Sequence, residues 1–179
     1  MVTKKREIKR FRRGNHGARG IGAKLVRQLP LWQCPRCRRR FANRNQSHFC
    51  GRHTLSHHLR GKPADIRKLY QLFVRHARRF GPVTIVPEKT RIALQVRMSF
   101  AALQLQQSKL VGHLVLAERH ELPCFIRIDS ISPHNHVHHF RIANPQDLNR
   151  ELSDCIRKAY SVGRQEHLRQ RVLKRSKRS

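Results

Sequence analysis

The chain has 179 residues and a formal net charge of +30, because 40 Lys and Arg residues stand against 10 Asp and Glu residues. Such an excess repels itself unless a polyanion neutralises it, so the composition favours nucleic acid as the partner. The ten acidic residues are few for the carboxylate ligands that two-metal nuclease chemistry needs. No apolar run approaches the roughly 18 residues of a membrane-spanning helix, so we expect no membrane insertion.

Residues 1–30 form a basic N-terminal extension. They hold ten Lys and Arg against one Glu, a net charge of +9, with four glycines and few large apolar residues. Such a segment cannot bury a core, so we expect it to be disordered alone and to contact nucleic acid. It also lacks the apolar centre of a secretory signal, which together with the cysteine usage indicates a cytoplasmic protein. The predicted contacts are Lys4, Lys5, Arg6, Lys9, Arg10, Arg12, Arg13, Arg19 and Lys24.

A Cys/His motif with metal-ligand spacing follows. Cys34 and Cys37 form a C-x2-C pair, and Cys50 comes after twelve further residues. Structural zinc takes four such ligands in a tetrahedron, so the motif predicts a Zn²⁺ site with one more ligand. His48 would share a strand face with Cys50, whereas His53 would complete a C-x2-H knuckle, and the spacing leaves both open. With four protein ligands the metal would be structural rather than catalytic.

The motif is surrounded by arginine and a few aromatic residues. Arginine pairs well with phosphate and stacks on bases, and we predict nucleic-acid contacts for Arg36, Arg38, Arg39, Arg40 and Arg44. Trp32, Phe41 and Phe49 could also stack on bases. We expect them instead to form the small core around the metal, as aromatics this close to a zinc site usually do.

Two helices are predicted after the motif. Thr54 is a suitable N-cap for a short helix that places Leu55 and Leu59 on one face. Pro63 and Gly81 bracket a longer helix, as a first-turn proline and a C-terminal glycine. The apolar residues of this second helix recur at intervals of three and four, which indicates one buried face. They are Ile66, Leu69, Tyr70, Phe73, Val74, Ala77 and Phe80.

The range 82–142 is predicted to form an antiparallel sheet. Apolar residues alternate with polar or small ones from Ile92 to Phe100, the pattern of one long half-buried strand. Short links between the later strands favour a meander. Asn144 and Pro145 then predict the start of a last helix, as N-cap and first helical residue. Its inner stripe is Leu148, Leu152, Ile156, Ala159 and Tyr160, and Gly163 is near its end.

A second basic segment ends the chain. Residues 164–179 hold seven Lys and Arg against one Glu, a net of +6, so residues 31–163 carry the remaining 30 − 9 − 6 = +15. The basicity is therefore not confined to the two ends. The predicted nucleic-acid contacts in this segment are Arg171, Lys174, Arg175, Lys177 and Arg178.

These patterns predict an α+β fold in four parts. They are a basic extension (1–30), a small zinc-binding module (31–61), a domain of one helix, an antiparallel sheet and a C-terminal helix (62–163), and a basic tail (164–179). Both basic ends are prone to disorder.

A cluster of histidines lies between positions 134 and 139. His136 and His138 would share one face of a strand, and His139 would take the other face. Two such imidazoles could bind a metal or transfer protons. Because no Asp or Glu cluster accompanies them, polar strand surface or hydrogen bonding in the core is the better interpretation.

Several ordered motifs resemble a bacterial family of domains of unknown function. They are Trp-Gln-Cys-Pro-Arg-Cys, Asn-Gln-Ser-His-Phe-Cys, Gly-Lys-Pro, Lys-Thr-Arg-Ile-Ala-Leu-Gln-Val-Arg and the stretch from Ser132 to Ile142. The resemblance covers residues 31–163 and implies an α+β domain preceded by a Cys/His metal motif, with no established activity. The histidine of the second motif belongs to the family pattern, which favours His48 as the fourth ligand.

The leading hypothesis is a non-enzymatic nucleic-acid-binding protein with structural zinc. RNA is favoured over DNA, and association with the ribosome is expected by analogy of composition. One alternative is a small enzyme or ligand-binding domain that its basic ends only localise. Its pocket would be built on the sheet from Lys89, Thr90, Arg91, Gln95, His136 and His138. Another alternative is a DNA-binding regulator that acts as a symmetric dimer.

Overall fold

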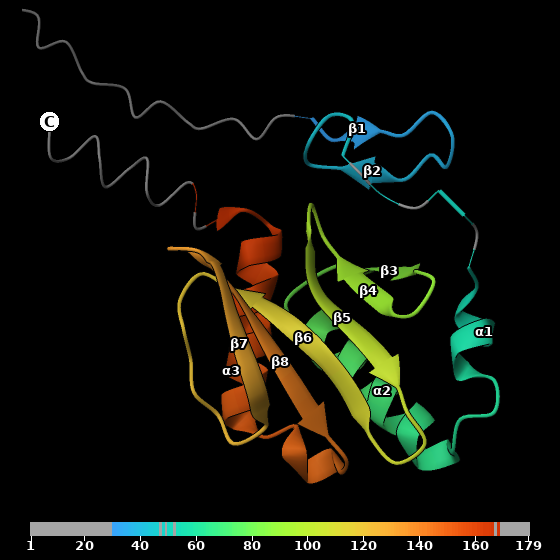
Figure 1. The fold of residues 1–179 in the computed structure, drawn as a ribbon, viewed down its shortest axis with the longest axis vertical. Helices are drawn as coiled ribbons and strands as arrows, with labels where there is room; N and C mark the ends of the chain where they lie inside the picture. Colours follow the sequence, from blue (N-terminus) through green and yellow to red (C-terminus); the bar gives the residue numbers. More distant parts are fainter. Residues whose placement is uncertain (1–29, 47, 49, 52, 167, 169–179) are drawn as a thin grey trace, which may run out of the picture.

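The computed structural model describes residues 30–46, 48, 50, 51, 53–166 and 168. Its first element is a hairpin of two short strands, β1 (Trp32–Gln33) and β2 (Arg40–Phe41), followed by helices α1 (Leu55–Leu59) and α2 (Ala64–Arg78). Figure 1 shows the hairpin as a separate small unit beyond one end of a six-stranded sheet. The α+β class predicted from the sequence is confirmed.

The predicted helix boundaries agree closely with the structure. Thr54 caps α1, because its side-chain oxygen accepts a hydrogen bond from the backbone N–H of His57 at 3.3 Å. Pro63 occupies the N-cap position of α2, and the helix ends three residues before Gly81. Six residues of the predicted α2 stripe are buried, and Phe80 packs against them at the end of the helix.

The sheet is entirely antiparallel. Its strands are β3 (Thr84–Pro87), β4 (Ile92–Gln95), β5 (Ser99–Leu105), β6 (Leu110–Leu116), β7 (Phe125–Ser132) and β8 (Asn135–Ile142). Their spatial order is β3-β4-β5-β6-β8-β7, so the predicted meander holds only as far as β6. Alternate side chains of β8 are buried while most of β7 is exposed. β8 therefore takes the inner position, and β7 is the edge strand.

One long predicted strand is in fact two. The chain reverses between β4 and β5, so that Leu94 pairs with Ala101. The turn is held by α3 (Arg150–Gly163), since the carbonyl oxygen of Gly163 accepts hydrogen bonds from the backbone N–H groups of Arg97 and Met98 at 3.2 and 3.0 Å. The alternation of apolar with polar or small residues continues through this short turn, so periodicity alone did not reveal the turn.

The last helix begins later than predicted. Asn144 and Pro145 open a short 3₁₀ helix, η1 (Pro145–Asp147), closed by a capping box between Asn144 and Asp147. The chain then starts again as α3, whose N-cap Asn149 accepts from the N–H of Leu152 at 2.9 Å. The predicted inner stripe is buried throughout.

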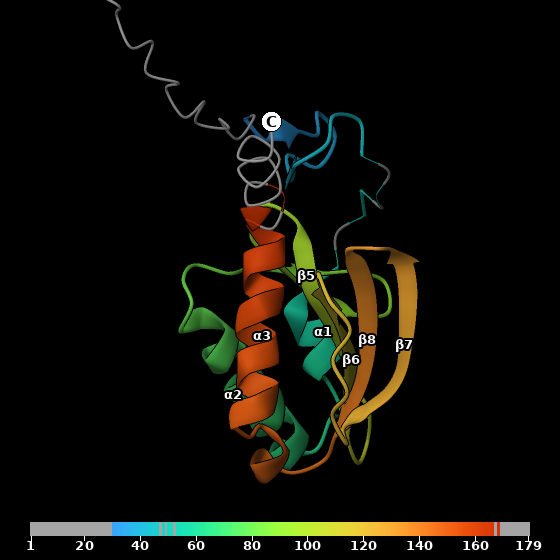
Figure 2. The same cartoon turned by 90° about the vertical axis from the view of Figure 1, so that its left-hand side faces the viewer.

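Helices α2 and α3 cover one face of the sheet, and the other face carries no helix (Figure 2). The core lies between the two layers. Phe73 of α2 stacks on Phe140 of β8 with ring centroids 5.3 Å apart, and both rings are fully buried. Gly112 of β6 makes room for this stack, because a Cβ there would overlap the Ala102 carbonyl oxygen and lie 2.9 Å from the Phe140 ring.

This close approach predicts that Gly112→Ala destabilises the domain. The added methyl group must displace a strand or the Phe140 ring, which costs about 1–3 kcal/mol. Urea unfolding followed by circular dichroism would measure the change. Val111→Ala is the matched control, because the half-buried Val111 side chain lies on the opposite face and its truncation should cost less than about 1 kcal/mol. Equal losses for the two variants would show that Gly112 is not tightly packed.

Candidate metal centre

The first half of the centre is a knuckle at the tip of the β1–β2 hairpin. The backbone N–H of Cys34 donates to the carbonyl of Arg39, and the N–H of Arg38 donates to the carbonyl of Cys34, both at 2.9 Å. Arg38 adopts a left-handed conformation with φ 58°, which lets the chain turn around the sulfur atoms. The knuckle therefore holds Cys34 and Cys37 on the same side of the hairpin.

The second half comes from His48 and Cys50. The Nδ1–H of His48 donates to the carbonyl of Gln46 at 2.6 Å, which turns its Nε2 towards the cysteines. That nitrogen lies 3.2 Å from Sγ of Cys37 and 3.3 Å from Sγ of Cys50. Metal-binding histidines usually donate their second ring N–H to a carbonyl or carboxylate in this manner.

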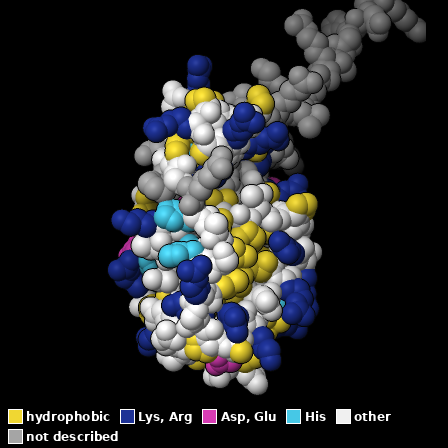
Figure 3. All heavy atoms as spheres, turned by 90° about the vertical axis from the view of Figure 1, so that its right-hand side faces the viewer, with side chains coloured by type: hydrophobic (Ala, Val, Ile, Leu, Met, Phe, Trp, Pro, Cys, Tyr) yellow, Lys and Arg dark blue, Asp and Glu magenta, His cyan; other side chains and the backbone are white. Residues whose placement is uncertain are grey.

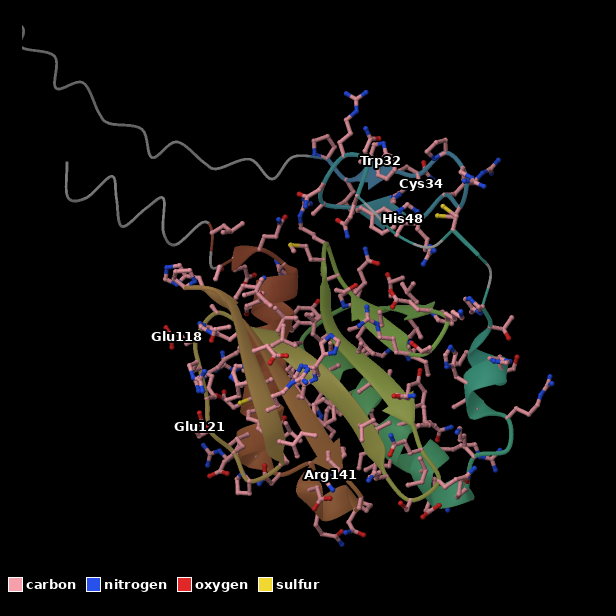
Figure 4. The ribbon with its side chains drawn as sticks, in the orientation of Figure 1. Trp32, Cys34, His48, Glu118, Glu121 and Arg141 are labelled. Carbon is pink, nitrogen blue, oxygen red and sulfur yellow. The ribbon has the colours of Figure 1, made fainter. Side chains whose placement is uncertain are left out.

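Aromatic rings support the histidine. The Phe41 ring centroid lies 4.2 Å from that of His48, and the Trp32 centroid lies 6.2 Å from it. Phe41 is buried and also contacts Trp32, so both rings form the small core predicted for them. Figure 4 shows Trp32, Cys34 and His48 gathered in the small unit beyond the sheet. Phe49, the third predicted core aromatic, lies outside the described residues.

The four side chains fit a tetrahedral metal. Their ligand atoms all lie within 4.8 Å of one another. The sulfurs of Cys34 and Cys50 are 3.8 Å apart, which matches the edge of about 3.8 Å expected for two sulfurs bonded to one zinc ion at 2.3 Å. A disulfide would instead bring them to about 2 Å. The group can thus hold one metal ion, and three sulfurs with one imidazole are compatible with zinc.

The electrostatics of the thiols also favour a metal. Burial opposes ionisation of Cys37, but hydrogen bonds from the side chain and backbone of Arg39 and from His48 outweigh it and lower the pKa of Cys37 to about 6. A hydrogen bond from the backbone of Cys37 lowers the pKa of Cys34, whereas burial raises that of Cys50. The thiolate is the form that binds metals, so the lowered pKa values of Cys34 and Cys37 favour metal binding.

The structure separates the two candidates for the fourth ligand. His48 belongs to the group, and His53, although described, lies outside it. Because the group supplies four ligands, it leaves no open position for a substrate or water, which is the arrangement of a structural site. Of the predicted nucleic-acid contacts around it, Arg39 is half-buried, and the other four are exposed. The contacts predicted in 1–29 and 169–179 lie outside the described residues.

The histidines of β8 divide between the two faces of the sheet, as predicted. His138 is fully buried on the helix side. Its Nε2 accepts from the backbone N–H of His120 at 3.0 Å, so its Nδ1–H is free to donate to the His136 carbonyl at 3.2 Å. His136 contacts the hydroxyl of Ser130 at 2.8 Å. These contacts are the hydrogen bonding in the core that the sequence suggested.

The pocket predicted as an alternative site does not form. Lys89, Thr90, Arg91 and Gln95 do line one cavity of about 430 Å³, on the face without helices. His136 and His138 lie across the sheet from it, opposite Leu116 and Leu114 of the core. The prediction was wrong because pairing between strands, which the sequence does not display, decides which side of each strand faces the helices.

A different pair of histidines reaches the open face. His139 of β8 pairs with His113 of β6, and their ring centroids are 5.8 Å apart. His139 also contacts the Asp129 carboxylate at 2.9 Å, and that carboxylate accepts from Arg127 at 2.9 Å. Sequence reasoning missed His113, whose only local signal was a polar residue at an outward position of a predicted strand.

The comparisons with known proteins identify a family. The sequence model of a domain of unknown function (DUF5655) matches residues 55–163, which is more than half of the chain. The chain belongs to this family. The match begins after the Cys/His group, so the metal centre precedes the matched residues. No curated protein and no solved structure shows significant similarity to the chain. Among the described residues, no helix combines the length and apolarity needed to cross a membrane.

The geometry predicts that His48→Ala and Cys34→Ser each abolish stoichiometric metal binding, while His53→Ala retains about one metal ion per chain. The reason is that removing one of four ligands opens the tetrahedron, and metal binding supplies folding free energy for so small a unit. Elemental analysis of the purified variants would measure this. Loss of the metal in His53→Ala with retention in His48→Ala would reverse the assignment.

The lowered pKa of His113, on the open face of the sheet, predicts that the stability of the fold depends on pH. Burial, aided by nearby Arg91 and His139, lowers the pKa of His113 to about 4. An unfolded histidine titrates near pH 6.5, so below that value the unfolded chain binds a proton that the folded chain refuses. The contribution of His113 to the free energy of unfolding is therefore fully present above about pH 6.5 and is lost as the pH falls towards about 4.

This dependence can be measured by urea unfolding at about pH 7 and about pH 4.5. Wild type should lose more free energy of unfolding between the two values than His113→Gln, which cannot take up the proton. Both proteins share the acid sensitivity of the thiols, so their difference isolates His113. Equal losses would contradict the assignment.

Proposed function

We propose that this protein is a non-enzymatic RNA-binding protein whose Cys₃His module is held together by zinc. The observation that carries the proposal is the charge of one stretch of chain. From Ile8 to Ala64 there are fifteen Lys and Arg residues and no Asp or Glu. A run of this kind is strongly self-repelling, and binding to a polyanion relieves that repulsion.

The described part of this stretch presents its charge to solvent. Arg36, Arg38, Arg40 and Arg44 are exposed, and no ion pair among the described residues involves them. Figure 3 shows Lys and Arg side chains spread over both the module and the domain, with few acidic side chains between them. Arginines in this state can pair with phosphate groups without first breaking internal contacts.

The backbone at Arg38 adds support. Its left-handed conformation costs a non-glycine residue about 1–2 kcal/mol, and glycine would fill the position without that cost. An arginine at a strained turn beside the metal centre favours a role for its side chain outside the module. A contact with a phosphate group is such a role.

Zinc is the metal that best suits the centre. Three cysteines and one histidine form a common structural zinc set, and soft thiolate ligands disfavour magnesium and calcium. The module also needs a metal, because its two strands have two residues each and its core consists of a few aromatic rings. The cysteines are free thiols, which suits a reducing cytoplasm.

Two observations favour RNA over DNA: the composition of the chain, and the position of the exposed arginines around a hairpin. Segments 1–29 and 169–179 add net charges of +9 and +6, and extensions of this composition are typical of proteins that bind folded RNA. Reading duplex DNA usually places a helix in the major groove. The exposed arginines of the module instead surround a hairpin. We therefore propose structured RNA, with the ribosome as the first candidate.

The proposal predicts how binding depends on salt. Each phosphate contact contributes about 0.7–0.9 to the slope of log affinity against log salt. Removing 1–29 and 169–179 should lower this slope severalfold, while a net charge of 30 − 9 − 6 = +15 keeps some affinity. The C-terminal cut follows Leu168 because the Gln165 side chain accepts from Arg97 at 3.1 Å. Fluorescence anisotropy with a labelled ribosomal RNA hairpin would measure the slope.

Two comparisons complete this experiment. Replacing Arg36, Arg38, Arg40 and Arg44 by Gln should weaken RNA binding more than the same change at Arg67, Lys68, Arg75 and Arg78, four exposed cations of α2. A DNA duplex of equal length should bind more weakly than the RNA. Stronger binding to the duplex by a dimer of the protein would replace the proposal with a DNA-binding regulator.

A further inference from the structure

The open face of the sheet carries a hollow of about 540 Å³. A row of paired residues crosses the face from β4 to β8: Ala93, Ala102, His113 and His139. The two alanines are small, and the imidazoles stand beside them. Three residues of this row, Ala102, His113 and His139, line the hollow, together with Val111 and the exposed Ile126. The hollow thus combines an apolar floor with aromatic nitrogen heterocycles.

The rim of the hollow is cationic. Arg91, Lys109 and Arg141 line it, together with the polar side chains of Thr90 and Gln104. No carboxylate is among the described residues that line it. Figure 4 shows Glu118 and Glu121 on the loop between β6 and β7, at the edge of the domain, and Arg141 on β8 in front of the sheet. Arg91 is paired with the Glu88 carboxylate at 2.7 Å, so Lys109 and Arg141 are the rim cations that can meet a phosphate group.

One of the two imidazoles is held in place by a carboxylate, and the other lies beside it. His139 is fixed by its 2.9 Å contact with Asp129, and His113 lies next to it with its ring tilted by 58°. Burial keeps His113 neutral at physiological pH. Unpaired RNA bases stack on aromatic side chains, including histidine, and on arginine planes. Two neighbouring imidazoles on an open sheet, one of them fixed by a carboxylate, are a suitable platform for this contact.

The hollow continues towards the metal module. A second cavity shares Thr90 and Arg91 with it and is lined on its far side by Arg39, Phe41 and His48. The module is joined to the sheet there, since the Gln95 side chain donates to the Arg40 carbonyl at 2.7 Å. A chain that leaves the module can therefore follow cationic side chains onto the sheet.

We infer that the open face of the sheet binds unpaired nucleotides of a single-stranded RNA segment, with bases against His113 and His139 and phosphates at Lys109 and Arg141. The inference rests on the proposed function and extends it, because it assigns the family domain its own RNA site apart from the basic ends and the metal module. An RNA duplex would not bind at this face, since its bases are already stacked on one another.

The experiment compares two double variants of the full chain. Lys109→Gln with Arg141→Gln removes two charges from the rim, and Arg67→Gln with Lys68→Gln removes two exposed charges from α2 on the helix layer. Anisotropy titrations would use a labelled single-stranded RNA of about 12 nucleotides and the same sequence as a duplex. The rim variant should weaken single-strand binding about tenfold and lower its salt slope by about 1.4, from two contacts at about 0.7 each. The α2 variant should change binding less than about twofold.

A further pair of variants tests the stacking. His113→Ala should weaken single-strand binding by at least about fivefold, and His113→Phe should restore it, because a base loses its platform in the first and keeps it in the second. Cross-linking with 4-thiouridine-substituted RNA should label peptides that contain His113 or His139. Circular dichroism would show that each variant is folded, and a misfolded one would be replaced by His139→Phe.

The outcomes separate the two proposals. Equal effects of the rim and α2 variants, equal losses for single strand and duplex, or cross-links confined to residues 1–62 would overturn this inference and leave RNA binding by the ends and module intact. Binding of adenosine monophosphate at the pocket with no effect of the rim variant on RNA would overturn it in favour of a free nucleotide. Failure of the wild-type chain to bind any RNA would overturn both proposals.

Discussion

The packing of two helices against only one face of the sheet is the constraint on which the rest of the structure depends. The Phe73–Phe140 stack and the glycine beneath it bring the layers together on that side. Every strand then has an inner side that faces the core, where the buried polar groups His136 and His138 are hydrogen-bonded, and an outer side with no such requirement. The outer side is consequently where polar and cationic residues can gather without loss of stability.

The metal module depends on a different kind of stabilisation. Its strands have two residues each, and its aromatic core is small, so it buries little apolar surface. Small units of this kind usually need a metal or disulfides. The geometry of the three sulfurs and the His48 nitrogen supplies the place for a metal, and the hydrogen bond that His48 donates to the Gln46 carbonyl fixes the imidazole in the orientation that a metal requires.

Charge is distributed unequally between these two parts. The ion pairs of the described residues lie in the α+β domain or, for Arg164 and Glu166, directly after it, where acidic residues neutralise part of the basic surface. The stretch from Ile8 to Ala64 has no acidic residue at all. In the proposed function, this asymmetry makes the stretch from Ile8 to Ala64 the main attractor for RNA. At the open sheet face, the proposed contacts depend on stacking as well as on charge.

The sequence by itself determined the features that depend on near neighbours. The stripe of α2, the cap at Thr54 and the C-x2-C knuckle are all set by residues a few positions apart, so local spacing predicted them. Only the tertiary structure decided that His48 rather than His53 joins the group, because the path of the intervening loop has no periodic signal. Three further features could not be predicted from the sequence either: the turn between Gln95 and Ser99, the position of β8 beside β6, and the contact of His113 with His139. Each depends on the register between strands, which is chosen by burial across the whole sheet and leaves no mark in the spacing along the chain.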